Sequence, residues 1–205
     1  MQHTYQAEGF GVRLRPVRME DAPFIIWLRN SDHAQGNIGD SASDVAGQEA
    51  WLRTYFKREG DCYFIVETPA GIPAGTYGIY HIQRGEAEPG RWVARPGVPV
   101  AIPSVLLALD LAFHQMKLIR LNGTTVATNE KVLSLNRKLG FRRVRVESAA
   151  QIIGGKAVDL VHYTMILADW LPAREQLLPL VRLAETQIRT WEKTQTAECQ
   201  PWLKR

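Results

Sequence analysis

The turn from Pro96 to Ser104 carries the residue types best suited to holding an anion. It leads into a strongly apolar segment, and main-chain N–H groups at the start of a helix attract phosphates. Proline has no N–H to donate, so Pro99 weakens this turn, whereas Pro103 presets the first helical turn. The remaining donors are the main-chain N–H groups of Val98, Val100, Ala101 and Ile102 and the hydroxyl of Ser104.

The elements before this turn are read from apolar periodicity. We predict strands at 10–17, 62–67, 72–82 and 90–95, and helices over 19–29 and after Ser43 or Asp44. After the turn, we predict a buried helix over 104–115, strands at 118–128 and 141–147, and a hairpin with arms 151–153 and 160–167. This order lacks the regular alternation of a doubly wound sheet, so it predicts a mixed sheet with helices on its faces, an α+β fold.

The segment from Asn129 to Phe141 predicts a short, tightly capped helix. Asn129 is a good N-cap, and Gly140 can take the left-handed conformation that ends a helix. An apolar stripe runs between these two caps and consists of Val132, Leu135 and Leu139.

This segment, Asn-x-x-Val-x-x-Leu-x-x-Lys-x-Gly-Phe, resembles the signature near the C-terminus of the GNAT superfamily of acyl-CoA N-acyltransferases. The element order matches the same family over roughly residues 10–168. The resemblance implies a mostly antiparallel central sheet with helices on both faces. It also implies acetyl-CoA as the cofactor, with Asn129 beside it and its diphosphate on the 96–104 turn. Because Pro99 replaces a family glycine, either the turn binds with fewer donors or it no longer binds.

The resemblance also implies catalytic roles. Glu88 matches an acidic position before the fourth strand and is the first candidate for general base; His81, whose unperturbed pKa lies near neutrality, is the second. Neither residue needs a catalytic role to explain its presence, since Glu88 can be a solvated turn residue and His81 a structural histidine at the end of a strand. Asn136 takes the position of the family's tyrosine acid and does not titrate, so it can only hydrogen-bond the sulfur or order a water. Tyr80 and Tyr163 are other phenols that can reach inward.

The N-terminal half resembles the GNAT branch containing nucleotide-amino-sugar and ribosomal-protein N-acetyltransferases. The segments that carry this likeness are 27–30, 38–41, 48–55, 63–67 and 75–80. The resemblance implies transfer of an acetyl group to a primary amine, first of a nucleotide-linked amino sugar, by direct attack in a ternary complex. The expected substrate contacts are Arg29, Asn30, Trp51, Tyr80 and Arg91. A protein N-terminal or polyamine acetyltransferase and a non-catalytic acyl-CoA-binding module are the alternatives.

Composition narrows the class of protein. The net charge of +4 comes from scattered residues, which suits a surface that attracts coenzyme phosphates as well as it suits nucleic acid, and we expect no nucleic-acid partner. The two cysteines, Cys62 and Cys199, lack metal-type spacing, and we expect no metal. Because no signal peptide or long apolar run is evident, we expect a cytoplasmic protein without a membrane partner.

The last part of the chain has a different pattern. Leu177, Leu180, Val181, Ala184, Ile188 and Trp191 fall on one helical face. We therefore divide the chain into a GNAT domain, residues 1–168, and an extra helical extension, residues 169–205. This face either packs on its own domain or forms a homodimer with a second copy.

Overall fold

The computed structural model describes residues 3–31, 42–153, 155–195 and 200–203. It confirms the α+β fold: within these residues one eight-stranded sheet has the order β1-β2-β3-β4-β5-β6-β8-β7. All neighbouring strands pair antiparallel except β5 and β6. The strands are β1 (Ala7–Gly9), β2 (Val12–Pro16), β3 (Cys62–Glu67), β4 (Pro73–Gln83), β5 (Glu86–Ala94), β6 (Arg120–Val126), β7 (Arg142–Ile153) and β8 (Lys156–Met165).

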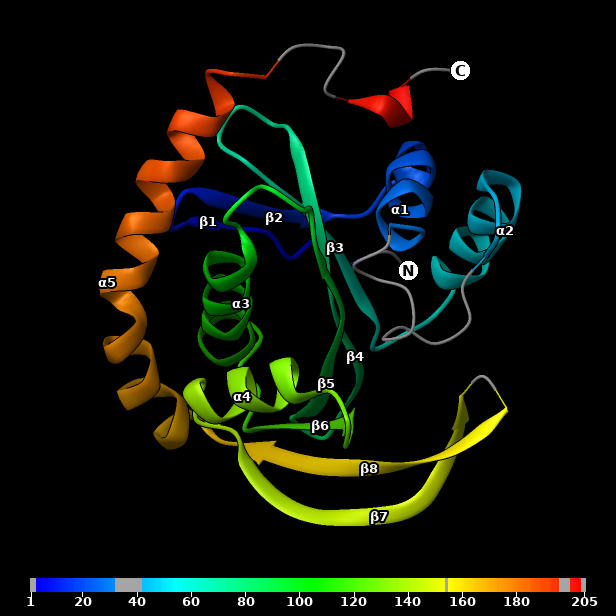
Figure 1. Cartoon of the computed structure of the whole chain (residues 1–205), viewed down its shortest axis with the longest axis vertical. Coiled ribbons are helices and arrows are strands. Elements are labelled where there is room, and N and C mark those ends of the chain that lie inside the picture. The colour runs from blue at the N-terminus through cyan, green and yellow to red at the C-terminus, as the bar shows by residue number, and fades with distance from the viewer. Residues whose placement is uncertain (1–2, 32–41, 154, 196–199, 204–205) are drawn as a thin grey trace.

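Helices cover both faces of this sheet (Figure 1). One face carries α1 (Ala22–Arg29), preceded by the short turn η1 (Met19–Asp21), and α2 (Val45–Tyr55). The other face carries α3 (Ala101–Asp110), its π-helical continuation η2 (Leu111–Gln115), α4 (Glu130–Lys138) and the long α5 (Leu167–Glu192). Each face has its own apolar core, because successive side chains of a strand point to opposite faces.

The parallel pair β5 and β6 opens the sheet. These strands are paired only at Glu86–Arg120 and Ala87–Leu121, near the start of each strand. The register contains no further pair between the described residues of β5 and β6. After the paired segment, β5 leads to α3, whereas β6 leads to α4. The unpaired ends of two central strands leave an opening between the two helical layers.

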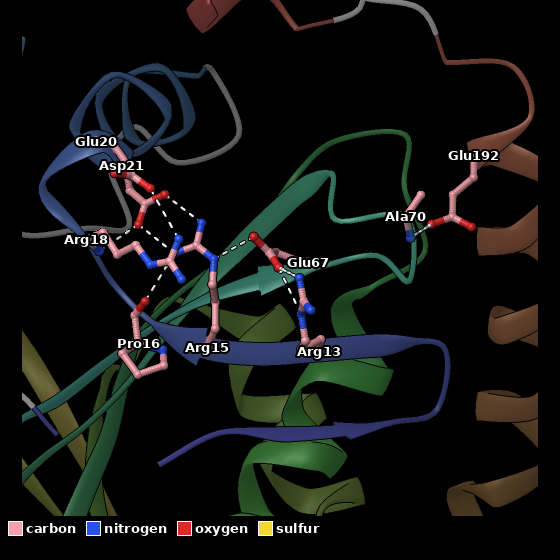
Figure 2. A network of polar contacts seen from close by, with 9 residues as sticks. All are labelled: Arg13, Arg15, Pro16, Arg18, Glu20, Asp21, Glu67, Ala70 and Glu192. Carbon is pink, nitrogen blue, oxygen red and sulfur yellow. Dashed lines mark hydrogen bonds and ion pairs between the residues drawn. The ribbon is translucent and has the colours of Figure 1, made fainter. Parts of the chain in front are cut away.

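A buried network of ion pairs fixes the N-terminal half of the sheet (Figure 2). Arg15 on β2 donates two hydrogen bonds of 2.7 Å to the carboxylate of Asp21, and its Nε donates to Glu67 on β3. Arg13 donates to the other oxygen of Glu67. Because the Asp21 and Glu67 side chains are both 6% exposed, losing Arg15 would leave the buried Asp21 without its cation and Glu67 with Arg13 alone.

The capped helix of the sequence analysis is confirmed as α4. Asn129 Oδ1 accepts a hydrogen bond of 3.2 Å from the N–H of Val132, and Gly140 has a φ of 87°. Phe141 donates its N–H to the carbonyl of Asn136 at 2.9 Å and is 8% exposed, so the chain folds back onto the helix. A Cβ at Gly140 would lie 2.6 Å from the carbonyl oxygen of Asp169 in α5.

Several predicted boundaries were wrong. β5 begins at Glu86, not Gly90, so Glu88 lies inside the strand and not in a turn before it. α3 begins at Ala101, and the hairpin has two long arms, β7 and β8, where shorter segments were predicted. The segment 38–41, one of those that carry the likeness to the amino-sugar branch, lies outside the described residues.

The helix α5 packs on its own domain. Trp170, Leu177, Val181 and Ile188 are buried in the same core cluster as α3, whereas Leu180, predicted on this stripe, is 55% exposed. The buried stripe of α5 begins earlier than predicted, because Trp170 and Ala173 belong to it. The domain boundary at residue 168 and a homodimer through this helix stay predictions.

Among the helices that the structure describes, none combines the length and apolar character needed to cross a lipid bilayer.

Candidate active site

A groove of about 490 Å³ passes through the opening between β5 and β6. Its wall includes residues from both helical layers: Arg29 at the end of α1 and Asn136 in α4. Two residues of the β7–β8 hairpin, Gln151 and Leu160, form part of the same wall. Two reactants that enter from opposite faces of the sheet can therefore meet in this opening.

The two predicted bases lie next to each other on neighbouring strands. Glu88 Oε1 lies 3.3 Å from His81 Nδ1, and the side chains are 42% and 73% exposed. Glu88 is also the register partner of Tyr80, so these two side chains share a face of the sheet. Glu88 and Tyr80 line the groove, whereas His81 is not part of its wall. This geometry makes Glu88 the better-placed proton acceptor, with His81 as its neighbour.

Gly90 gives Tyr80 its place beside Glu88. A Cβ at Gly90 would lie 2.4 Å from the Tyr80 hydroxyl oxygen and 3.0 Å from the ring. Burial and the charge of Glu88 raise the pKa of Tyr80, and the nearby Arg91 opposes this rise. The phenol therefore stays protonated at neutral pH and can act as a hydrogen-bond donor in the groove.

Arg91 lies among aromatic rings on the α2 side of the sheet. Its guanidinium carbon is 4.5 Å from the ring centre of Tyr80, 5.3 Å from Trp51 and 5.6 Å from Tyr63. Both of its terminal nitrogens donate to Asp61, whose side chain is 8% exposed. Cation–π and bidentate contacts together hold this cation rigidly at the edge of the groove.

A second pocket of about 240 Å³ adjoins the groove and shares Arg29 and Arg91 with it. Arg58, with its guanidinium carbon 5.3 Å from the Trp51 ring centre, and the buried Gln48 complete the polar part of its wall. Two guanidinium groups share one carboxylate here, since Asp61 pairs with Arg91 and lies 3.7 Å from Arg58. Among the described residues, this arginine pocket therefore carries an excess of positive charge.

The opposite side of the groove is apolar and lies under α4. Val132, Leu135 and Leu139, the predicted stripe, line it together with Asn129 and Asn136. Tyr163 on β8 lines the same wall and is 5% exposed. Burial raises the pKa of Tyr163, and the charges of Arg143 and Arg137 partly oppose the rise, so the phenol is a neutral donor at physiological pH.

The turn before α3 retains part of the expected set of donors. Three N–H groups of the turn already have partners. Val98 donates to the carbonyl of Arg95, Val100 donates to the carbonyl of Val98, and Ser104 donates to the carbonyl of Val100. The Ser104 hydroxyl is buried, donating to the carbonyl of Ala101 and accepting from Trp92 Nε1 at 3.2 Å. Ala101 and Ile102, in the first turn of α3, have no acceptor within the helix, so their N–H groups suit a diphosphate.

The structure thus gathers half of the predicted site residues around one opening, whereas the turn residues Val98, Val100, Ala101, Ile102 and Ser104 line neither the groove nor the arginine pocket. Arg29, Tyr80, Glu88, Arg91, Asn129 and Asn136 line the groove, and Trp51 lines the arginine pocket. Asn30 is the C-cap residue of α1 and belongs to neither wall. The sequence analysis did not select Arg58, Gln48, Gln151 or Leu160, because their relation to the site depends on how separate elements pack.

This architecture, a mixed sheet opened between two parallel strands with helices on both faces, is that of an acyl-CoA N-acyltransferase. The model of the acetyltransferase (GNAT) domain family matches residues 12–142, more than half of the chain. The chain belongs to this family and is an N-acetyltransferase that uses acetyl-CoA. No curated protein sequence is significantly similar to it.

Three solved structures share the fold at low sequence identity. FdhC, described as a nucleotide-linked sugar GNAT, is 23% identical with a TM-score of 0.70, covering 88% of this chain and 98% of its own. RimJ from Mycobacterium smegmatis in complex with CoA-disulfide is 22% identical with a TM-score of 0.72 (87% and 96%). A mutant of spermidine N-acetyltransferase SpeG from Vibrio cholerae is 20% identical with a TM-score of 0.69 (80% and 98%).

Proposed function

We propose that this enzyme transfers the acetyl group of acetyl-CoA to the primary amine of a nucleotide-linked amino sugar, by direct attack in a ternary complex in the cytoplasm. The observation that carries this proposal is the arginine pocket, which adjoins the groove on the α1 and α2 side. A nucleotide-linked sugar carries phosphates, which guanidinium groups bind well. A polyamine is a cation, and the same charges repel it.

The coenzyme site in this proposal lies on the α3 and α4 side. The first-turn N–H groups of Ala101 and Ile102 hold the diphosphate, and Asn129, Val132 and Leu135 line the path of the pantetheine arm. Acetyl-CoA supplies the activated acetyl group. The groove fits this role because it has one apolar wall and reaches Val105, one turn into α3.

Proton transfer completes the proposal. Glu88 Oε1 accepts the proton of the attacking amine, and His81 Nδ1 at 3.3 Å stabilises the carboxylate. On the other wall, the hydroxyl of Tyr163 donates to the departing sulfur, a role that Asn136 cannot fill because an amide does not titrate. Trp51 lines the arginine pocket and holds the guanidinium groups of Arg58 and Arg91 against its ring, with Tyr55 stacked on it at 5.5 Å.

The test is a thiol-release assay with acetyl-CoA and three kinds of acceptor: nucleoside-diphosphate amino sugars, polyamines and peptide N-termini. We expect turnover with a nucleotide-linked amino sugar, and competitive inhibition by the corresponding nucleoside diphosphate without an amine. Efficient turnover of spermidine or of a peptide N-terminus, without inhibition by nucleotides, would contradict the sugar assignment in favour of that acceptor. Acetyl-CoA hydrolysis unaffected by every acceptor would contradict the whole proposal.

A further inference from the structure

The C-terminal turn η4 (Pro201–Leu203) lies close to α1, at the top of Figure 1. Trp202 in this turn packs against Phe24, with ring centres 4.9 Å apart, and against Trp27, at 4.7 Å. These rings join the core cluster of the α1 and α2 layer. The last described residues of the chain are therefore anchored on the domain.

Trp202 also contacts Arg95, the residue immediately before the turn from Pro96 to Ser104. The guanidinium carbon of Arg95 lies 4.9 Å from the ring centre of Trp202, 4.9 Å from Trp191 and 5.6 Å from Trp27. The three tryptophans come from η4, the end of α5 and α1, and Arg95 is 8% exposed. A guanidinium enclosed by three indole rings is held more firmly than a solvent-exposed one, because cation–π contacts strengthen on desolvation.

Arg95 connects to the start of α3 through a continuous series of main-chain hydrogen bonds. Its carbonyl accepts from the N–H of Val98, the carbonyl of Val98 accepts from Val100, and the carbonyl of Val100 accepts from Ser104. At its other side, the N–H of Arg95 donates to Ala74 on β4 at 2.8 Å. A shift of Arg95 therefore changes the turn from which the N–H groups of Ala101 and Ile102 emerge.

We propose that the three tryptophans, through Arg95, set the position of the diphosphate-binding turn, so that the C-terminal segment is a positioning element for acetyl-CoA. The end of α5 is tied to the same side of the sheet, since Glu192 accepts from the N–H of Ala70 in the β3–β4 turn at 2.7 Å (Figure 2). None of the three rings lines the groove, and their effect on the coenzyme in this proposal is exerted through the turn.

The experiment measures the dissociation constant of acetyl-CoA by isothermal titration, which needs no acceptor amine. We expect Trp202→Ala, and a chain that ends after residue 195, to raise this constant by about fivefold or more, the size of one lost aromatic contact to a desolvated cation. Trp202→Phe keeps an aromatic ring and should restore most of the affinity. With an active acceptor, KM for acetyl-CoA should rise while kcat at saturation stays within about twofold.

Leu28→Ala is the matched control, because Leu28 is fully buried in the same layer and is not one of the three rings around Arg95. We expect it to lower the melting temperature without changing the affinity for acetyl-CoA. If Trp202→Ala lowers the melting temperature but binds acetyl-CoA as tightly as the unchanged chain, the ring is structural only and the proposal is wrong. Equal losses of affinity in Leu28→Ala and Trp202→Ala would reject it as well. An inactive chain that still binds acetyl-CoA and responds to Trp202→Ala would contradict the proposed acceptor and leave the positioning role supported.

Discussion

The arginine pocket makes a prediction about which substrates bind, and Arg58 is the residue that tests it. Arg91 is unsuitable, because its removal would take both close hydrogen bonds from the buried carboxylate of Asp61 and leave it only Arg58 at 3.7 Å, at a cost of about 3–5 kcal/mol in stability. Arg58 is 42% exposed and lies 3.7 Å from Asp61, so Arg58→Gln should fold normally. The variant removes one positive charge from the wall of the pocket.

The expected effect follows from the exposure of Arg58. A hydrogen bond to a charged group is worth about 1.5–3 kcal/mol when buried and a fully exposed ion pair about 0–1 kcal/mol. For a half-exposed guanidinium we take about 1 kcal/mol, which corresponds to roughly a fivefold rise in KM for an anionic acceptor. The KM for acetyl-CoA and kcat should not change, because Arg58 does not line the coenzyme side of the groove.

The assay compares KM for the nucleotide-linked amino sugar at low and high salt. Arg58→Gln should weaken binding most at low salt, since screening already reduces this contribution at high ionic strength. Arg53→Gln is the matched control: Arg53 lies on α2, pairs with Glu49 and is 61% exposed, outside the pocket. Equal effects of the two variants, or an unchanged KM in Arg58→Gln, would refute an anion-binding role for the pocket.

Four other predictions follow from the same structure. Glu88→Gln should lower turnover about a hundredfold near neutral pH, and less at a pH where the amine is already deprotonated; an unchanged pH–rate profile would remove Glu88 as the base. Because the pKa of Tyr163 is raised, its hydroxyl stays protonated to high pH. Tyr163→Phe should therefore lower kcat across the neutral range without altering the affinity for acetyl-CoA in a titration. An unaltered kcat would refute the role of Tyr163 as the proton donor. Gly140→Ala should lower the free energy of unfolding by about 1–3 kcal/mol in denaturant titration, since a Cβ would overlap the Asp169 carbonyl; a neutral effect would contradict that close approach. Trp170→Ala should lower the free energy of unfolding by about 3–5 kcal/mol, whereas Leu180→Ala, on the exposed side of α5, should lower it by under about 0.5 kcal/mol. Comparable losses in the two variants would contradict the packing of α5.

The local features of the sequence were the most predictable part of the fold. The helix after Asn129 was predicted because a cap, a short stripe and a terminating glycine act within a few residues of one another. The start of β5 was missed for the opposite reason. Pro89 and Gly90 read as a turn, yet both lie within the strand, where the absence of a Cβ makes room for the ring of Tyr80 on β4.

The composition of the site was harder to predict from the sequence than the helices and strands, because it depends on how distant elements pack together. Glu88, Arg91 and Asn136 were selected through a family resemblance, and the groove brings them to one opening. Nothing local to the sequence indicates that Arg58, which follows α2, lies beside Arg29 at the end of α1. Nor does the spacing of Trp27, Trp191 and Trp202 indicate that all three surround Arg95, because their meeting depends on the path of α5 across the domain.

The central claim is that two substrates approach from opposite faces of the sheet and meet between β5 and β6. A crystal structure of the chain with CoA and a nucleoside-diphosphate amino sugar tests it most directly. The account predicts the CoA diphosphate at the N–H groups of Ala101 and Ile102, the sugar phosphates on Arg29 and Arg58, and the amine within hydrogen-bond reach of Glu88. Both ligands on the same face of the sheet, or an arginine pocket left empty beside a bound sugar nucleotide, would contradict it.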